Sequence, residues 1–313
     1  MATVIVFGPT GAVGSAAART AQQQGSKVYL ALRDITKSVP GLTADQEREG
    51  GFERVQADFS QPETISTAVA QSHAKHAFIY TDLTSADYMR ASFTALKAAG
   101  IESVVLLSTF GIQEDIRSVS PEHLIAFVHA QAEISLQEVF GANGYVAVRP
   151  GFYASNTLWW KAPIQTGHVN LAWPDGPFDW ISPEDIGGVC GTILAHKAKG
   201  IDLAAGESFV YLVGPEQMSV RGVVETIGRV LRKEVTITEV EEQEALDSLV
   251  NQSGLHEGIA RSVLGFCRSA TEGDSFIDIP AYGESVGNIQ KYLRRAPMRF
   301  HEWVEANQDK FMA

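Results

Sequence analysis

The feature that most constrains the fold is a glycine-rich run close to the start of the chain. Residues 3–7 form an apolar, β-branched stretch, and this stretch is followed directly by Gly8-Pro9-Thr10-Gly11-Ala12-Val13-Gly14. A helical pattern over residues 13–24 comes next, so the run joins a strand to a helix. In that context the first glycine permits a tight turn, the second lets a diphosphate approach the backbone, and the third allows the helix to pack closely on the strand. The run therefore predicts a dinucleotide-binding domain.

The rest of the chain divides into two patterns. Up to residue 150, short β-rich runs alternate with amphipathic stretches, as parallel βαβ units do, and we expect strands at 3–7, 27–32, 53–57, 76–81, 103–108 and 145–149 and a helix around 121–140. Later residues hold aromatic and proline-rich pieces, helices near 184–198 and 220–231, and strand-like runs at 208–213 and 235–240. We predict an α/β fold in which residues 1–150 form a Rossmann, doubly wound parallel sheet. Residues 151–313 would form a smaller α+β substrate lobe able to return strands to that sheet.

Composition excludes several classes of function. The net charge of −12 opposes binding to a phosphate backbone, so nucleic acid is not an expected partner. Cys190 and Cys267 give neither a disulfide framework nor a metal site, and the eight histidines show no ligand spacing. No apolar run has the length of a membrane span. We expect a cytoplasmic monomer or homodimer that binds a small molecule and holds no metal.

The tip of the second predicted strand bears on the choice of nucleotide. Arg33 stands there, where an NAD-preferring fold would place an acidic residue on the ribose 2′-hydroxyl. A guanidinium suits a 2′-phosphate, and Lys37 adds a second positive charge. NADP(H) is therefore the expected cofactor, although Asp34 keeps NAD open. Asp58-Phe59, after the third strand, is placed to meet the adenine, or Asp58 simply caps a turn.

With these motifs in place, the chain resembles the NmrA-like branch of atypical short-chain dehydrogenases. The resemblance rests on the glycine run with Arg33-Asp34 and on three further segments in matching order, His129–Ile134, Val148–Asn156 and Trp180–Gly187. The family includes plant isoflavone- and phenylcoumaran-type reductases, bacterial quinone reductases and fungal tailoring enzymes. It also includes regulators that bind dinucleotide without turnover. The resemblance therefore implies the fold and the cofactor more strongly than an activity.

The chain departs from the family at the proton donor. We find no Tyr-x-x-x-Lys pair, and the position where the family's reductases carry a catalytic lysine is Gln131. Glutamine can hydrogen-bond a ribose, but it is no general acid. His129, Tyr80 and Tyr153 are the other candidates for catalysis, and each tyrosine is equally compatible with a core position.

The tips of the fifth and sixth strands supply the remaining candidates. Ser108-Thr109 should face the nicotinamide, and Gly151-Phe152 should also contact the cofactor. Aromatic residues after the strand tips would line a pocket for a flat, apolar substrate, although about half of such residues are expected to be simple core packing. They are Phe110, Tyr153, Trp159, Trp160 and Trp173.

Two functions follow from these expectations. The first is an NADPH-dependent reductase of a C=N or C=C bond, such as an imine, iminium, enone or quinone, in an aromatic or polycyclic molecule. Natural-product tailoring coupled to a cyclisation fits this chemistry. The second is a non-catalytic NADP(H) sensor that binds a protein partner. A deep aromatic pocket favours the enzyme, and an exposed apolar patch favours the sensor.

Overall fold

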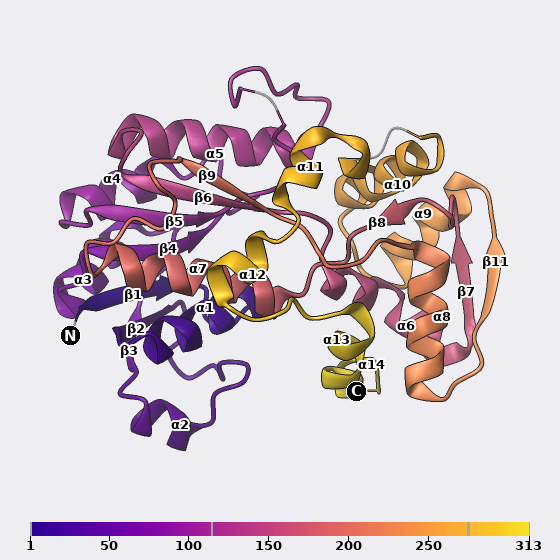
Figure 1. Cartoon of the computed structure of the whole chain (residues 1–313), viewed down its shortest axis with the longest axis horizontal. Coiled ribbons are helices and arrows are strands. Elements are labelled where there is room, and N and C mark those ends of the chain that lie inside the picture. Colours follow the sequence, from indigo (N-terminus) through magenta and orange to yellow (C-terminus); the bar gives the residue numbers. More distant parts are fainter. Residues whose placement is uncertain (1, 114, 274–275, 313) are drawn as a thin grey trace.

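The computed structural model describes residues 2–113, 115–273 and 276–312, which form two parts lying side by side (Figure 1). The described residues of the larger part contain a seven-stranded parallel sheet in the order β3-β2-β1-β4-β5-β6-β9. Its strands, in chain order, are β1 (Thr3–Phe7), β2 (Lys27–Leu32), β3 (Glu53–Gln56), β4 (His76–Tyr80), β5 (Ser103–Leu107), β6 (Tyr145–Pro150) and β9 (Phe209–Leu212). The first six follow the strand order of dinucleotide-binding folds, so the predicted Rossmann architecture is confirmed.

Helices cover both faces of this sheet, which explains why its strands are nearly continuous apolar runs rather than alternating ones. One face carries α1 (Ala12–Gln23), α7 (Pro183–Lys197) and α12 (Asn288–Leu293). The other face carries α3 (Pro62–Ser72), α4 (Arg90–Ala98) and α5 (Leu124–Phe140). The short α2 (Ala44–Glu49) lies in the connection between β2 and β3.

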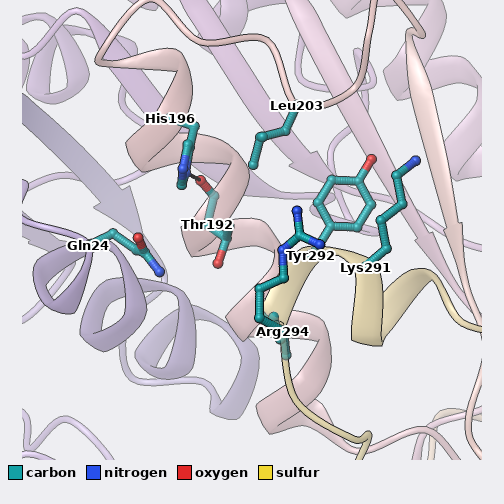
Figure 2. Close-up of a pocket in the computed structure, with 8 residues that line it drawn as sticks. Gln24, Thr192, His196, Leu203, Lys291, Tyr292 and Arg294 are labelled. Atoms are coloured by element: carbon teal, nitrogen blue, oxygen red, sulfur yellow. Dashed lines mark hydrogen bonds between the residues drawn. The ribbon is translucent and has the colours of Figure 1, made fainter.

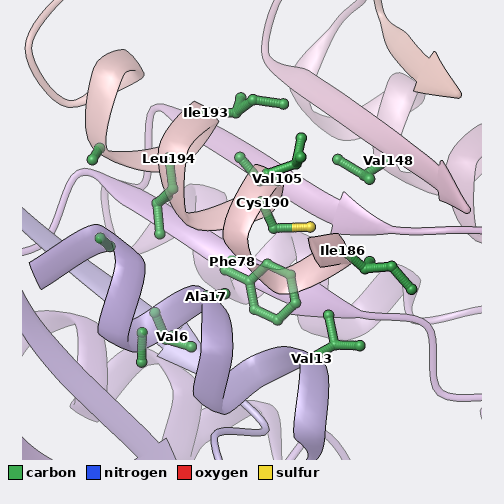
Figure 3. Packing of buried hydrophobic residues seen from close by; sticks show 14 of the residues in the cluster. Val6, Val13, Ala17, Phe78, Val105, Val148, Ile186, Cys190, Ile193 and Leu194 are labelled. Atoms are coloured by element: carbon green, nitrogen blue, oxygen red, sulfur yellow. The ribbon is translucent and has the colours of Figure 1, made fainter. Parts of the chain in front are cut away.

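The contact between α1 and α7 depends on two glycines. A Cβ on Gly187 would lie 2.3 Å from the carbonyl oxygen of Val13, and one on Gly191 would lie 2.4 Å from that of Ala17. The two helices therefore touch backbone to backbone. Figure 3 shows the core beneath them, where the Cys190 thiol and the Phe78 ring fill the space between helices and sheet.

The smaller part has a core of its own, built on aromatic and aliphatic side chains. Its elements are η1 (Ala154–Trp160), α6 (Lys161–Thr166), β7 (His168–Leu171), β8 (Pro177–Phe178), β10 (Met218–Ser219), α8 (Val220–Leu231), β11 (Thr236–Glu239), α9 (Glu242–Asn251), α10 (Glu257–Thr271), α13 (Phe300–Ala306) and α14 (Gln308–Met312). β7 pairs in parallel with β11, and β8 pairs in antiparallel fashion with β10. The connection back to the first part contains η2 (Phe276–Asp278) and α11 (Pro280–Ser285).

Two features differ from a simple division at residue 150. The predicted strand at 208–213 is β9, which lies in the main sheet beside β6, and α7 covers that sheet. Residues after 150 therefore contribute to both parts. β7 was not predicted, because its alternation of polar and apolar residues extends over only four positions. In the described chain, no helix is long and apolar enough to cross a membrane.

Candidate functional site

A cleft opens at the carboxyl ends of β1 to β4, where ligands bind in open α/β sheets. The predicted cofactor residues that line it are Gly8, Thr10, Arg33, Asp58, Phe59 and Tyr80. Pro9 and Asp82 also line the cleft. In the part of the chain that the structure describes, no group of three or more His, Cys, Asp or Glu side chains is arranged to hold a metal ion.

The glycine loop has the geometry that a bound diphosphate requires. Gly8 has φ +67°, in the left-handed region, and the Tyr80 ring lies where its Cβ would be. A Cβ on Gly14 would lie 2.2 Å from the carbonyl oxygen of Gly8, so helix and loop pack without space for a side chain. Gly11 is the N-cap residue of α1, and the helix has no side-chain cap and no acidic residue in its first turn. The amide groups of that turn are thus left for an anion.

Arg33 is exposed at the tip of β2 and, in the described chain, its guanidinium makes no hydrogen bond or ion pair. The neighbouring Asp34 carboxylate is occupied, because its Oδ1 accepts hydrogen bonds from the amide and hydroxyl of Thr36. Arg54 braces the loop that follows by donating to the carbonyl oxygens of Ile35 and Lys37. Lys37 lies outside the cleft lining. Of the two predicted cations, Arg33 is therefore the one that lines the cleft.

A repeated D-x-[ST] pattern in the sequence marks three of the strand tips. Asp34, Asp58 and Asp82 follow β2, β3 and β4, and each is followed two residues later by serine or threonine. In each case the aspartate Oδ1 accepts from the amide and the hydroxyl of that residue. Such Asx turns end a strand without leaving polar groups unpaired. The repeated D-x-[ST] pattern would have added Asp82 to the predicted site.

The tip of β5 is organised differently from the prediction. Ser108 is buried, and its hydroxyl donates to Glu133 Oε1 at 2.5 Å. Glu133 in turn binds Arg149 through Nε at 3.0 Å and Nη2 at 2.7 Å, and both side chains are at most 3% exposed. The expectation that Ser108 faces the nicotinamide is therefore corrected. Its hydroxyl belongs to a buried charge network, whereas Thr109 at the same tip is only partly buried.

The candidate proton donors have pKa values unsuited to acid catalysis at neutral pH. Burial lowers the pKa of His129 to about 4, and its Nδ1 has no hydrogen-bond partner in the described chain. Burial raises the pKa of Tyr153 far above its usual value, and it also raises that of Tyr80. Tyr80 lies on Gly8 in the nucleotide cleft. Gln131 is partly buried on α5 and cannot donate a proton as an acid.

The aromatic candidates divide between core and surface. Phe110 is buried against Tyr211, with ring centroids 4.7 Å apart, and Trp160 is buried in the core of the smaller part. These two predictions of pocket-lining residues are wrong, because both rings are used for packing. Trp159 and Trp173 remain partly exposed, as does Tyr153.

Gly151 and Phe152 have a structural role that the sequence did not reveal. A Cβ on Gly151 would lie 2.3 Å from the carboxylate of Asp179, which accepts from the amides of Phe152 at 2.7 Å and Gly214 at 2.8 Å. Asp179 thus ties the end of β6 to the segment after β9. Burial raises the pKa of Asp179 to about 6. Contacts of Gly151 and Phe152 with a cofactor stay a prediction.

Comparison with known proteins places this geometry in context. The model of the NmrA-like family matches residues 1–285. The chain is 35% identical to the nitrogen metabolite regulation-like protein bik4 of Gibberella fujikuroi, with 96% of this chain and 95% of that protein covered.

Solved structures with the same fold include two reductases. The NADPH complex of the NADPH-dependent quinone oxidoreductase QOR2 of Escherichia coli has a TM-score of 0.72 at 19% identity, covering 98% of this chain and 99% of that one. The triphenylmethane reductase of Citrobacter sp. has a TM-score of 0.73 at 16% identity, covering 99% of this chain and 100% of that one. At these identities the likeness concerns the fold alone.

Proposed function

Because the chain belongs to the NmrA-like family, we propose that it is an NADPH-dependent oxidoreductase that reduces an electron-poor C=N or C=C bond of an aromatic small molecule. The observation that carries the proposal is the nucleotide cleft, in which an unpaired Arg33 stands beside the glycine loop in the described chain. A cytosolic monomer or homodimer acting in natural-product tailoring remains part of the proposal.

The residues of the cleft fit NADP(H) on three counts. The glycine loop leaves room for a diphosphate, and the uncapped start of α1 offers amide donors to it. The Arg33 guanidinium has the planar donors that a 2′-phosphate accepts. The Asp34 carboxylate, which would favour a 2′-hydroxyl, is held by Thr36. This arrangement supports NADP(H) over NAD(H).

None of the candidate proton donors in the described chain is a usable acid at neutral pH, and this restricts the substrates. Bound NADPH would supply a hydride, and the residues of this chain decide which acceptors can use it. Gln131 can orient a hydroxyl group of the ribose, while His129 is neutral and Tyr153 holds its proton tightly at neutral pH. An iminium carbon accepts hydride without protonation at that carbon, and a quinone oxygen can take its proton from water. These acceptors fit, and neutral ketones do not.

The partly exposed aromatic residues of the smaller part support a flat substrate. The Trp159 ring meets Phe152 edge-on at 6.1 Å, and Trp173 lies under the guanidinium of Arg268 at 5.6 Å. Such rings offer apolar area with little loss of conformational entropy on binding. A polycyclic cation or quinone is the class of molecule that these surfaces suit, and steering a cyclisation is compatible with them.

The test combines binding and turnover. Calorimetric titration should give tighter binding for NADPH than for NADH. Absorbance at 340 nm should then fall when a cyclic iminium or a quinone is added, and should stay constant with a neutral ketone. A Gln131→Lys variant should gain activity on the ketone, because lysine restores a proton donor at the family's position. NADPH binding without oxidation by any acceptor would reject the reductase.

One observation favours a second candidate, an NADP(H)-sensing regulator. The relative that is 35% identical over nearly the whole chain is named a regulation-like protein, not an enzyme. A regulator needs the nucleotide cleft but no acid, which agrees with the state of His129 and Gln131. This candidate would be favoured by NADPH binding without turnover, together with nucleotide-dependent capture of a purified protein partner.

A further inference from the structure

A second cavity lies far along the chain from the glycine loop, where α1 ends against α7 and α12. Its volume is about 310 Å³, at the lower end of the range for small-molecule sites. Gln24 follows α1, Thr192 and His196 lie on α7, and Tyr292 and Arg294 come from α12 and its end. Figure 2 shows these side chains around the same space.

The cavity results from the way the three helices meet. Gly187 and Gly191 bring α7 into backbone contact with α1, and the larger residue Thr192 comes directly after them. On another side of α7, Leu293 packs against Gly188, where a Cβ would lie 3.1 Å from its methyl group. The contacts of α7 with α1 and with Leu293 leave a hollow at the last turns of α7, beside Thr192 and His196. The hollow is thus built into the core packing and does not depend on a loop.

A buried hydroxyl in the wall of the cavity has no partner. Thr192 is 2% exposed, and its Oγ1 forms no hydrogen bond within the described chain. An unpaired buried hydroxyl destabilises a fold, and natural proteins leave few of them. Figure 2 places Thr192 between His196 and Arg294, with Gln24 across from it. A ligand atom in the cavity is a hydrogen-bond partner that this hydroxyl lacks.

The neighbouring imidazole is oriented by the same residue. His196 Nδ1 lies 2.8 Å from the carbonyl oxygen of Thr192, an acceptor, so Nδ1 carries the proton. The other ring nitrogen, Nε2, is then the free one. In the neutral ring it accepts a hydrogen bond from a ligand hydroxyl. The Gln24 amide, at the other side of the opening, can donate as well as accept.

The charge at the cavity is positive, against the net charge of −12 of the whole chain. The Arg294 side chain makes no ion pair or hydrogen bond in the described residues, and Lys291 lies over the Tyr292 ring at 5.4 Å. Lys199 donates to the carbonyl oxygen of Gln24. The nearby carboxylate of Asp202 is paired with Lys197 at 3.0 Å. A guanidinium with free donors binds carboxylate or phosphate in bidentate fashion.

From these contacts we propose that the cavity binds a small organic oxyanion, a carboxylate or phosphate monoester that also carries a hydroxyl group. The oxyanion would pair with Arg294, and the hydroxyl would hydrogen-bond with Thr192 Oγ1 and His196 Nε2. Leu203 and Leu293 supply apolar contact for its carbon skeleton. The site is separate from the nucleotide cleft, because the cleft lies at the start of α1 and this cavity at its end.

The test uses calorimetric titration of the full chain with citrate and with glycerol 3-phosphate, before and after saturation with NADPH. We expect saturable binding of at least one of the two probes, unchanged by NADPH. The probe that binds more tightly identifies the oxyanion. Arg294→Gln and Thr192→Val should each weaken binding at least tenfold.

Two features keep the test decisive. Arg232→Gln is the matched control. Arg232, like Arg294, ends a helix in the left-handed conformation, with φ +53° for Arg232 and +57° for Arg294. Unlike Arg294, it lies outside the cavity. It should leave binding unchanged. Thr192→Val should raise the melting temperature of the free protein, since it removes an unpaired hydroxyl. Failure of both probes to bind, competition by NADPH, or equal affinity in the wild type and the Arg294 and Thr192 variants would overturn the proposal.

Discussion

Glu133→Gln should be among the most destabilising conservative substitutions in this protein. The Glu133 carboxylate accepts three hydrogen bonds, from Ser108 and from two nitrogens of Arg149. Because both members of the ion pair are at most 3% exposed, the amide would leave the guanidinium charged, buried and unpaired. Breaking one partner of such a pair costs about 3–5 kcal/mol. At roughly 2 °C per kcal/mol for a chain of this size, the melting temperature should fall by about 6–10 °C.

The same helix provides the control. Glu138 lies on α5 and forms an exposed ion pair with Arg90, so Glu138→Gln should cost less than about 1 kcal/mol. The double variant Glu133→Gln with Arg149→Met should recover much of the loss, because it removes the stranded charge. Thermal unfolding followed by circular dichroism measures all of these variants. The reasoning is refuted if Glu133→Gln costs no more than Glu138→Gln, or if the double variant is less stable than the single one.

Three further outcomes are expected. Arg33→Ala should weaken NADPH binding by roughly 1–3 kcal/mol in calorimetry and leave NADH binding unchanged, whereas equal losses would remove Arg33 from the 2′-phosphate. Gly187→Ala should cost roughly 1–3 kcal/mol of unfolding free energy, because its Cβ would lie 2.3 Å from a backbone oxygen of α1. The control Gly265→Ala, which has open space at its Cβ, should be neutral or stabilising. A Gly187→Ala variant as stable as the wild type would contradict the close contact between the helices. Burial raises the pKa of Asp179 to about 6, so its contribution is fully present below about pH 4, the unfolded value, and is lost as pH rises through 6. The stability advantage of the wild type over Asp179→Asn should therefore shrink by about 2 kcal/mol between pH 4 and pH 7 in urea unfolding, and a constant difference would refute the assignment.

Much of the fold and part of the lining of the nucleotide cleft could be predicted because they depend on local chemistry. The first glycine turn, the helix after it and the apolar strands are each specified by residues within a few positions of one another. The same holds for Arg33, because it follows β2 directly and the carboxyl ends of the strands in an open parallel sheet lie at the ligand cleft. The D-x-[ST] turns are equally local, because each aspartate bonds the residue two positions later.

Other predictions failed because side-chain direction depends on distant residues. Ser108 follows β5 directly, but Glu133 lies 25 residues later and draws its hydroxyl into the interior. Phe110 follows the same strand and meets Tyr211 of β9, a strand whose place in the sheet no local pattern reveals. Trp160 belongs to a core formed by segments far apart in sequence.

By itself, the sequence determined the Rossmann architecture and the character of the nucleotide cleft, because hydrophobic periodicity, turn glycines and a strand-tip arginine act over short distances. Only the tertiary structure decided which polar groups are buried and which are free to meet a ligand. The Ser108–Glu133–Arg149 network, the neutral His129 and the unpaired Thr192 hydroxyl all follow from how helices pack on the sheet. Burial and hydrogen bonding are properties of the assembled core, and residues that supply them to one side chain come from elements far away in the chain.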